Sequence, residues 1–189
     1  MTALPAPTLT TARLRLRPFE DSDTAALFAL QSDPRVLRYW DSPPWTDPAR
    51  AERFLRTCRD IADEGDGARL AVERTSDGAF VGWCSATRWD PQHRSISLGY
   101  VYDEAVWGRG YAAESVAALL QWVFDTLDAH RVQAVTDTRN DASVRLLERL
   151  GFTREGTLRE DCTVDGEVSD SHVYGLLRRE WAGPPTRTH

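Results

Sequence analysis

The sequence predicts a single domain of the α/β (α+β) class. Segments in which apolar and polar residues alternate, as in strands, are interspersed with segments whose apolar residues recur every three or four positions, as in helices. Along the 189 residues these segments predict the order β-α-α-β-β-β-α-β-α-β-β, only part of which follows strand–helix–strand crossover logic. We expect the domain to cover residues 11–181, with flexible, proline-containing tails at 1–10 and 182–189.

The N-terminal half predicts a strand, two helices and a hairpin. The strand at 13–19 alternates arginine with leucine, which is typical of a strand with one solvated face. A helix begins after the capping residues at 21–23 and ends at Pro34, and a short helix and an irregular loop rich in tryptophan and proline follow at 33–46. The remaining elements are a helix at about 47–64 and strands at 68–74 and 80–88, joined by the turn residues 76–78.

The C-terminal half predicts four strands and two helices. Gly151 ends the second helix in a position that suits a left-handed backbone, and residues 164–167 form a turn between the last two strands. In chain order the elements are a strand at 95–102, a helix at about 110–128, a strand at 132–138, a helix at 140–150, and closing strands at 152–159 and 170–178.

Composition favours a cytoplasmic protein that binds neither membrane nor nucleic acid. No apolar run approaches the roughly 18 residues that a membrane-spanning helix needs, and the pattern of a signal peptide is missing. The formal net charge is −6, and basic residues form no block. Three cysteines without paired spacing and four scattered histidines indicate reduced thiols and no metal site.

A Gly-x-Gly turn joins the strand at 95–102 to the following helix. Gly108 and Gly110 allow the backbone to bend and to approach a ligand closely. The amides from Trp107 to Ala112 then lie at a helix N-terminus, which favours an anion such as a diphosphate. Two other interpretations are a tight connection without a ligand and a dinucleotide-binding fold. The second is disfavoured because the glycines lie about five residues beyond the strand, without repeated βαβ units.

A second motif begins about 30 residues later. Asn140 can cap a helix, Ser143 lies in its first turn, and Gly151 and Phe152 follow its end. Each residue alone has an ordinary structural explanation. Their combination with the glycine turn is far more specific.

Together these motifs resemble those of the GNAT (Gcn5-related) N-acetyltransferase superfamily. Trp107–Ala112 is similar to its Q/R-x-x-G-x-G/A loop, with tryptophan where the pattern prefers glutamine or arginine, and Asn140–Phe152 is similar to its second coenzyme A motif. The strand RLRLRPF and the phrases WGRGYAAE and GFTREGTLRE are most similar to the RimJ/RimL branch, which acetylates ribosomal proteins on N-terminal alanine. The resemblance covers residues 11–180. It implies a mostly antiparallel, mixed seven-stranded sheet with a splay between two parallel central strands and helices on both faces.

The resemblance also implies the site. Tyr100, Val101 and Tyr102 would pair with the pantetheine arm of acetyl-CoA, and Asn140 would contact the same arm. The amides of Trp107, Gly108, Arg109, Gly110, Tyr111 and Ala112 would hold the diphosphate. Ser143 would protonate the departing thiolate. The resemblance does not identify the general base, because Cys162 stands where a relative has glutamate. Glu160 and Asp161 are candidates, and a strand would direct at most one of them into the site.

The resemblance implies direct transfer of the acetyl group to an amine in a ternary complex. The acceptor is either the N-terminal α-amine of a protein or peptide, or a small molecule such as an antibiotic, polyamine or amino acid. A non-catalytic acetyl-CoA sensor is a third interpretation. The loop at 37–46, with Trp40 and Trp45, is a candidate wall of the acceptor site. A monomer and a homodimer are both compatible with the sequence.

Overall fold

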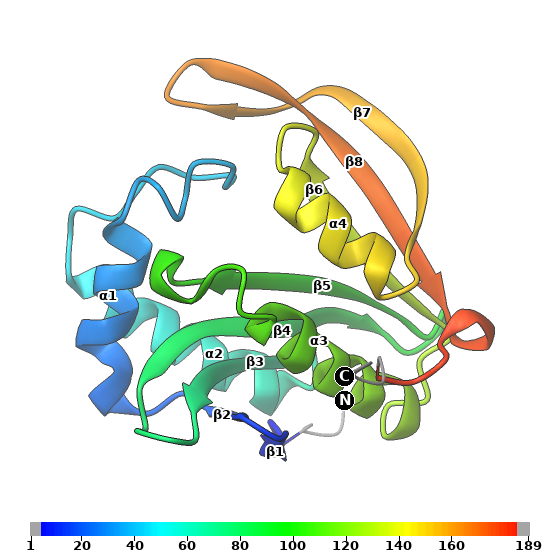
Figure 1. Cartoon of the computed structure of the whole chain (residues 1–189), viewed down its shortest axis with the longest axis horizontal. Helices are drawn as coiled ribbons and strands as arrows, with labels where there is room; N and C mark the ends of the chain where they lie inside the picture. Colours follow the sequence, from blue (N-terminus) through cyan, green and yellow to red (C-terminus); the bar gives the residue numbers. More distant parts are fainter. Residues whose placement is uncertain (1–4, 185–189) are drawn as a thin grey trace.

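The computed structural model describes residues 5–184. Its eight-stranded sheet has the order β1-β2-β3-β4-β5-β6-β8-β7, and all neighbours are antiparallel except β5 and β6 (Figure 1). The strands are β1 (Leu9–Thr10), β2 (Leu14–Pro18), β3 (Gly67–Arg74), β4 (Phe80–Asp90), β5 (Ser95–Tyr102), β6 (Arg131–Asp137), β7 (Thr153–Val164) and β8 (Glu167–Leu177). The helices are α1 (Thr24–Ser32), α2 (Ala49–Glu64), α3 (Tyr111–Asp125) and α4 (Asp141–Arg149).

The class and the mixed sheet with its parallel central pair confirm the prediction, and three details correct it. The sheet has eight strands instead of seven, because Leu9–Thr10, assigned to a tail, pairs with β2. The short helix expected within 33–46 is replaced by turns in this described segment. The last two strands are longer than predicted, because Asp165 and Gly166, both with positive φ, make a tight turn at which both strands continue to the ends of the hairpin. Residues 1–4 and 185–189 of the predicted tails lie outside the described residues.

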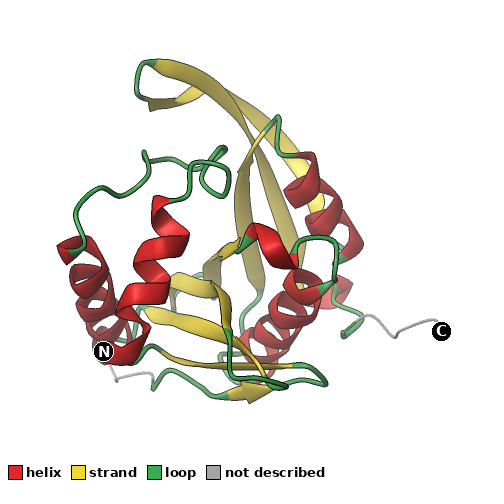
Figure 2. Cartoon of the chain, turned by 60° about the vertical axis from the view of Figure 1, so that its left-hand side comes forward, coloured by secondary structure: helices red, strands yellow, loops and turns green. Residues whose placement is uncertain are grey.

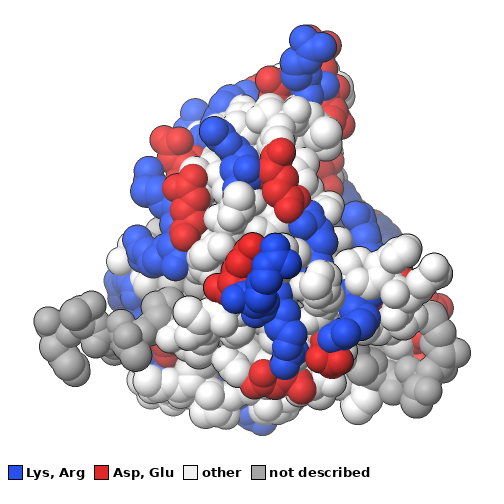
Figure 3. All heavy atoms as spheres, turned by 90° about the vertical axis from the view of Figure 1, so that its right-hand side faces the viewer, with Lys and Arg blue, Asp and Glu red and all other residues white. Residues whose placement is uncertain are grey.

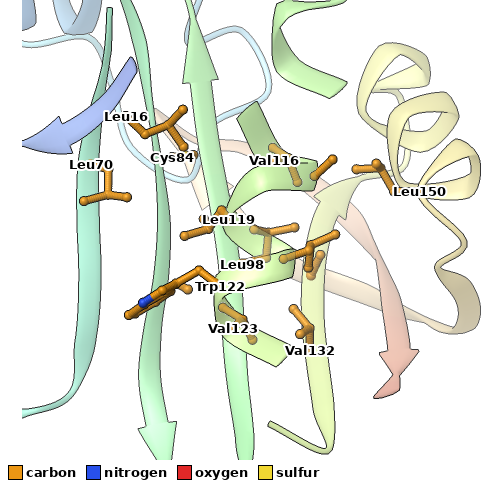
Figure 4. Close-up of a cluster of buried hydrophobic side chains, with 14 of the residues drawn as sticks. Leu16, Leu70, Cys84, Leu98, Val116, Leu119, Trp122, Val123, Val132 and Leu150 are labelled. Atoms are coloured by element: carbon orange, nitrogen blue, oxygen red, sulfur yellow. The ribbon is translucent and has the colours of Figure 1, made fainter. Parts of the chain in front are cut away.

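Helices cover both faces of the sheet (Figure 2), and alternation along the strands builds a core on each face. On one face Leu70, Cys84 and Leu98 pack with the apolar side of α3 (Figure 4). On the other face Ala71 and Trp83 pack with α1 and α2. None of the helices within residues 5–184 is both long enough and apolar enough to cross a membrane.

The core holds two thiols that make stability sensitive to alkali. Burial raises the pKa of Cys58 and of Cys84 from 9.0 to about 12. The unfolded chain therefore loses these protons at lower pH than the folded chain. The contribution of the two thiols to the free energy of unfolding is fully present well below pH 9 and is lost as the pH rises from about 9 to 12.

Between pH 8 and 9.5 we expect each thiol to remove about 0.8 kcal/mol from the free energy of unfolding. Urea titrations at the two pH values measure the loss. In Cys84→Ala the loss should be about half as large. An unchanged pH dependence in that variant would show that this thiol is not the cause.

Charged side chains of both signs are mixed on the face drawn in Figure 3, where the described residues form no continuous basic surface. Within the described part of the chain, no group of three or more His, Cys, Asp or Glu side chains could hold a metal ion.

Candidate active site

The two parallel strands separate part of the way along the sheet. Pairing of β5 with β6 covers Ser95–Leu98 and Arg131–Ala134 and then stops, whereas β5 stays paired with β4 as far as Tyr102 and β6 stays paired with β8 as far as Asp137. Figure 1 shows the two strands diverging from this point. We call the unpaired inner edges, residues 99–102 and 135–137, the splay. The predicted splay is therefore present.

Register decides which backbone groups point into the splay. The amide of Asp103 donates to the carbonyl of Val81 at 3.0 Å, so residues 103 and 81 form a hydrogen-bonded pair. In an antiparallel ladder such pairs alternate with non-bonded ones. Tyr100 and Tyr102 therefore direct their N–H and C=O groups toward the splay. Val101 directs its own toward Trp83 of β4, which corrects its predicted role as a backbone partner of pantetheine.

The Trp107 side chain covers one end of the splay. Its indole Nε1 donates to the carbonyl oxygen of Tyr102 at 2.8 Å, and the side chain is half exposed. Its backbone amide donates to the carbonyl of Glu104 at 3.1 Å. The prediction assigned only the Trp107 backbone to ligand binding, so the structure adds a side-chain function that the motif does not contain.

The glycine turn leaves the N-terminus of α3 open. Gly108 and Gly110 have φ values of +73° and +78°, which favour glycine. Gly110 is the N-cap of α3, and no side chain in the described part of the chain caps this helix. Because the first amides of a helix have no partner within it, those of Gly110, Tyr111 and Ala112 are available to an anion. The amide of Arg109 instead faces the carbonyl of Val106 at 3.4 Å.

Arg13 holds this turn in place from the neighbouring end of β2. Its guanidinium donates to the Glu114 carboxylate at 2.7 Å and to the Arg109 carbonyl at 3.0 Å, and it lies 4.5 Å from the centre of the Tyr111 ring. Burial alone would raise the pKa of Glu114, but hydrogen bonds from Thr11 and Arg13 outweigh it and lower that pKa. The open helix end is thus fixed by side chains beneath it.

Arg13→Gln is expected to raise the KM for the diphosphate-bearing ligand about 5- to 10-fold, because the turn loses its clamp. It should also lower the free energy of unfolding by about 1–2 kcal/mol. Steady-state kinetics and urea unfolding measure the two effects. Arg15→Gln, on the same segment but exposed, is the matched control and should change neither value appreciably; equal effects in the two variants would contradict the clamp.

Across the splay, α4 presents Ser143. The Asn140 side chain accepts a hydrogen bond from the Ser143 amide at 3.1 Å, which confirms Asn140 as the helix cap. The Ser143 hydroxyl lies 2.7 Å from the hydroxyl of Tyr100 on β5. The structure therefore brings Tyr100 and Ser143, both predicted site residues, into contact. The prediction gave Tyr100 only a backbone function, so the contact of its hydroxyl group is new. The only signal was that Tyr100 shares a strand face with Leu98 and Tyr102.

Glu160 lies in an irregular part of β7. Leu158 pairs with Ser171 and Cys162 with Ser169, so three residues of β7 bulge opposite Asp170. Glu160 has φ +54°, and its amide donates to the Asp170 carboxylate at 2.8 Å. The strand alternation on which the separation of Glu160 from Asp161 was predicted is interrupted here by the bulge. The Glu160 carboxylate is exposed, and its role as a base stays a prediction.

The opposite face of β4 and β5 is aromatic. Trp40, from the segment 33–46, packs edge-on against Trp83 with ring centres 5.7 Å apart, and Trp83 pairs with Val101. Trp40 is half-buried, whereas Trp45 is buried against Phe54 in the core. Trp40 therefore stays a candidate wall of an acceptor site, while Trp45 contributes packing.

Arg139 connects this face to the β7–β8 hairpin. It pairs with Asp137 at the end of β6 and with Glu167 of the hairpin, and its guanidinium lies 5.8 Å from the ring centre of Tyr39. In Figure 1 the hairpin arches over the same side of the molecule as the segment 33–46. Trp40 with Trp83 on one side and the β7–β8 hairpin on the other thus border one region beside the splay.

Comparisons with known proteins agree with this geometry. The family model of the acetyltransferase (GNAT) domain matches residues 13–153. The uncharacterized N-acetyltransferase p20 of Bacillus licheniformis is 32% identical over 176 residues, which cover 93% of this chain and 99% of that protein. The spermidine N(1)-acetyltransferase of Escherichia coli (strain K12) is 23% identical over 172 residues, 89% of this chain and 88% of the relative.

Among solved structures, RimL, a ribosomal L7/L12 α-N-protein acetyltransferase in complex with coenzyme A, superimposes with a TM-score of 0.82. The match covers 90% of this chain and 98% of that one at 20% identity, and it shows that the two share a fold. The family model covers well over half of the chain. The chain therefore belongs to the GNAT family of acetyltransferases.

Proposed function

We propose that the protein transfers the acetyl group of acetyl-CoA to a primary amine. The observation that carries this proposal is the position of the splay, which ends beside the uncapped N-terminus of α3. The backbone of Tyr100 and Tyr102 would pair with the pantetheine arm. The amides of Gly108, Gly110, Tyr111 and Ala112 would bind the diphosphate through hydrogen bonds and the helix dipole.

The reaction is direct attack of a neutral amine on the thioester carbonyl. Ser143 would protonate the leaving thiolate, and Glu160, acting directly or through water, would accept the proton of the amine. A peptide α-amine with a pKa near 8 is roughly a tenth neutral at pH 7, whereas an alkylammonium like that of lysine, with a pKa about 2.4 units higher, costs about 3.3 kcal/mol more to deprotonate. An α-amine acceptor can therefore react with the help of a weaker general base than an alkylamine acceptor requires.

The N-terminal α-amine of a protein or peptide is our preferred acceptor, in line with a RimJ/RimL-like branch in the cytoplasm. It suits a site in which the candidate bases Glu160 and Asp161 are both exposed. A polyamine or another small amine is the second candidate, and the spermidine acetyltransferase among the relatives favours it. Either acceptor would enter on the side bordered by Trp40 and the β7–β8 hairpin.

A thiol-release assay with acetyl-CoA tests the function. We expect turnover with N-terminal peptides at KM values well below those for spermidine and other alkylamines. The reverse order would assign the protein to the small-amine class. Calorimetric binding of acetyl-CoA without thiol release across a broad panel would instead identify a sensor, and the absence of binding would contradict the proposal altogether.

A further inference from the structure

Two hydroxyl groups meet at the splay. The Tyr100 phenol, from β5, and the Ser143 hydroxyl, from α4, lie 2.7 Å apart, and either atom can be the donor. Ser143 is 8% exposed, and Asn140 fixes its amide from the other side. Ser143 is therefore fixed at two points where the two central strands part: its hydroxyl contacts a residue of β5, and its backbone amide is bound by the helix cap.

We propose that Tyr100 and Ser143 form a two-hydroxyl relay that delivers a proton to the departing thiolate of coenzyme A. This inference rests on the proposed function, in which Ser143 faces the sulfur. Tyr100 acts only through Ser143: it donates to the serine oxygen and leaves the serine proton directed at the thiolate.

The proton balance explains why a partner is needed. As the amide C–N bond forms and the C–S bond breaks, the electron pair of that bond moves to sulfur. Sulfur takes the Ser143 proton while the serine oxygen takes the Tyr100 proton, and the resulting phenolate regains a proton from water. A serine hydroxyl alone is a poor acid, because the pKa of an aliphatic alcohol lies well above that of a phenol, which is ordinarily about 10.

The surroundings keep the Tyr100 proton in place until it is needed. Burial raises the pKa of Tyr100 to about 12, and the Ser143 hydrogen bond opposes that rise only in part. The Tyr102 ring lies 6.4 Å from that of Tyr100, and the phenol of Tyr174 on β8 donates to Glu148 of α4 at 3.3 Å. Because the phenol stays neutral throughout the working pH range, it serves as a proton source rather than as a base.

Tyr100→Phe removes one oxygen and tests the relay. In single-turnover acetyl transfer to a substrate amine, we expect the rate to fall at least 10-fold, with the dissociation constant of acetyl-CoA changed less than 2-fold. Ser143→Ala should lose at least as much. The double variant should be no slower than Ser143→Ala, because the two hydroxyls act in series.

A proton inventory separates relay from packing. In mixtures of H₂O and D₂O, the wild-type transfer rate should curve with deuterium fraction, as two protons in motion require, and the Tyr100→Phe rate should vary linearly. The matched control is Tyr174→Phe, which removes a neighbouring phenol oxygen hydrogen-bonded to Glu148 and should retain the wild-type rate and curvature.

Two results would overturn the relay while the enzyme remains an acetyltransferase. One is a Tyr100→Phe rate within 2-fold of wild type, and the other is multiplication of the two single-variant effects in the double variant. A wild-type protein that binds acetyl-CoA but transfers nothing to any amine would overturn the proposed function, and the relay with it. The wild-type assay thus distinguishes the two failures.

Discussion

Gly110→Asp is expected to weaken acetyl-CoA binding at least 100-fold. Gly110 has φ +78°, a backbone conformation that aspartate tolerates better than most residues. Among residues 5–184, a Cβ at this position would meet one neighbour within 4 Å outside the turn itself, a guanidinium nitrogen of Arg13 at 3.6 Å, so the side chain fits. A carboxylate there would stand at the uncapped end of α3 and repel the diphosphate by an amount that exceeds the roughly 2.7 kcal/mol of a 100-fold change.

Gly110→Asn is the matched control, because asparagine has nearly the same shape and also tolerates positive φ, but carries no charge. We expect it to weaken binding less than 10-fold. Calorimetric titration with acetyl-CoA compares the variants, and urea unfolding checks that both fold as well as the wild type. Equal losses of affinity would mean that the amides at 110–112 do not bind the diphosphate.

Most of the fold could be predicted because its signals are local. The alternation of arginine and leucine at 13–17 and the apolar stripe of α3 each lie within one segment, and the strand at 95–102 was predicted with the bounds that the structure has. The strand at Leu9–Thr10 was missed because two residues have no periodicity. Their pairing with β2 comes from tertiary structure.

The site could be predicted only where motifs define it. Gly110 and Asn140 lie where the glycine turn and the helix cap require. The contact of Tyr100 with Ser143 joins residues 43 positions apart, and it depends on how a strand faces a helix across the splay. The bulge that displaces Glu160 depends on the pairing of β7 with β8. Neither relationship is expressed in the spacing of residues along one segment.

A different glycine supports the splay from behind, in β4. Gly82 has φ +150°, and a Cβ there would lie 2.3 Å from the carbonyl oxygen of Val101 and 2.9 Å from the Cα of Tyr102. Both atoms belong to the backbone of β5, so no side-chain rotation relieves the clash. The strand whose Tyr100 and Tyr102 groups border the splay can lie at its observed distance only because residue 82 has no side chain.

Gly82→Ala is therefore expected to lower the free energy of unfolding by about 3–5 kcal/mol, or the Tm by roughly 10–15 °C. The matched control is Gly78→Ala, in the β3–β4 turn, where φ is +71° but no atom of the described residues beyond the immediate chain neighbours lies within 4 Å of the added carbon. Backbone strain alone should cost about 1–2 kcal/mol there. Thermal unfolding of both variants measures the difference.

Because β5 must move to admit the methyl group, the Gly82→Ala protein that remains folded should also bind acetyl-CoA more weakly, whereas Gly78→Ala should bind it normally. Similar stability in the two variants would show that β4 and β5 adjust freely, and that the position of the splay edge is not set by the absence of a side chain at residue 82.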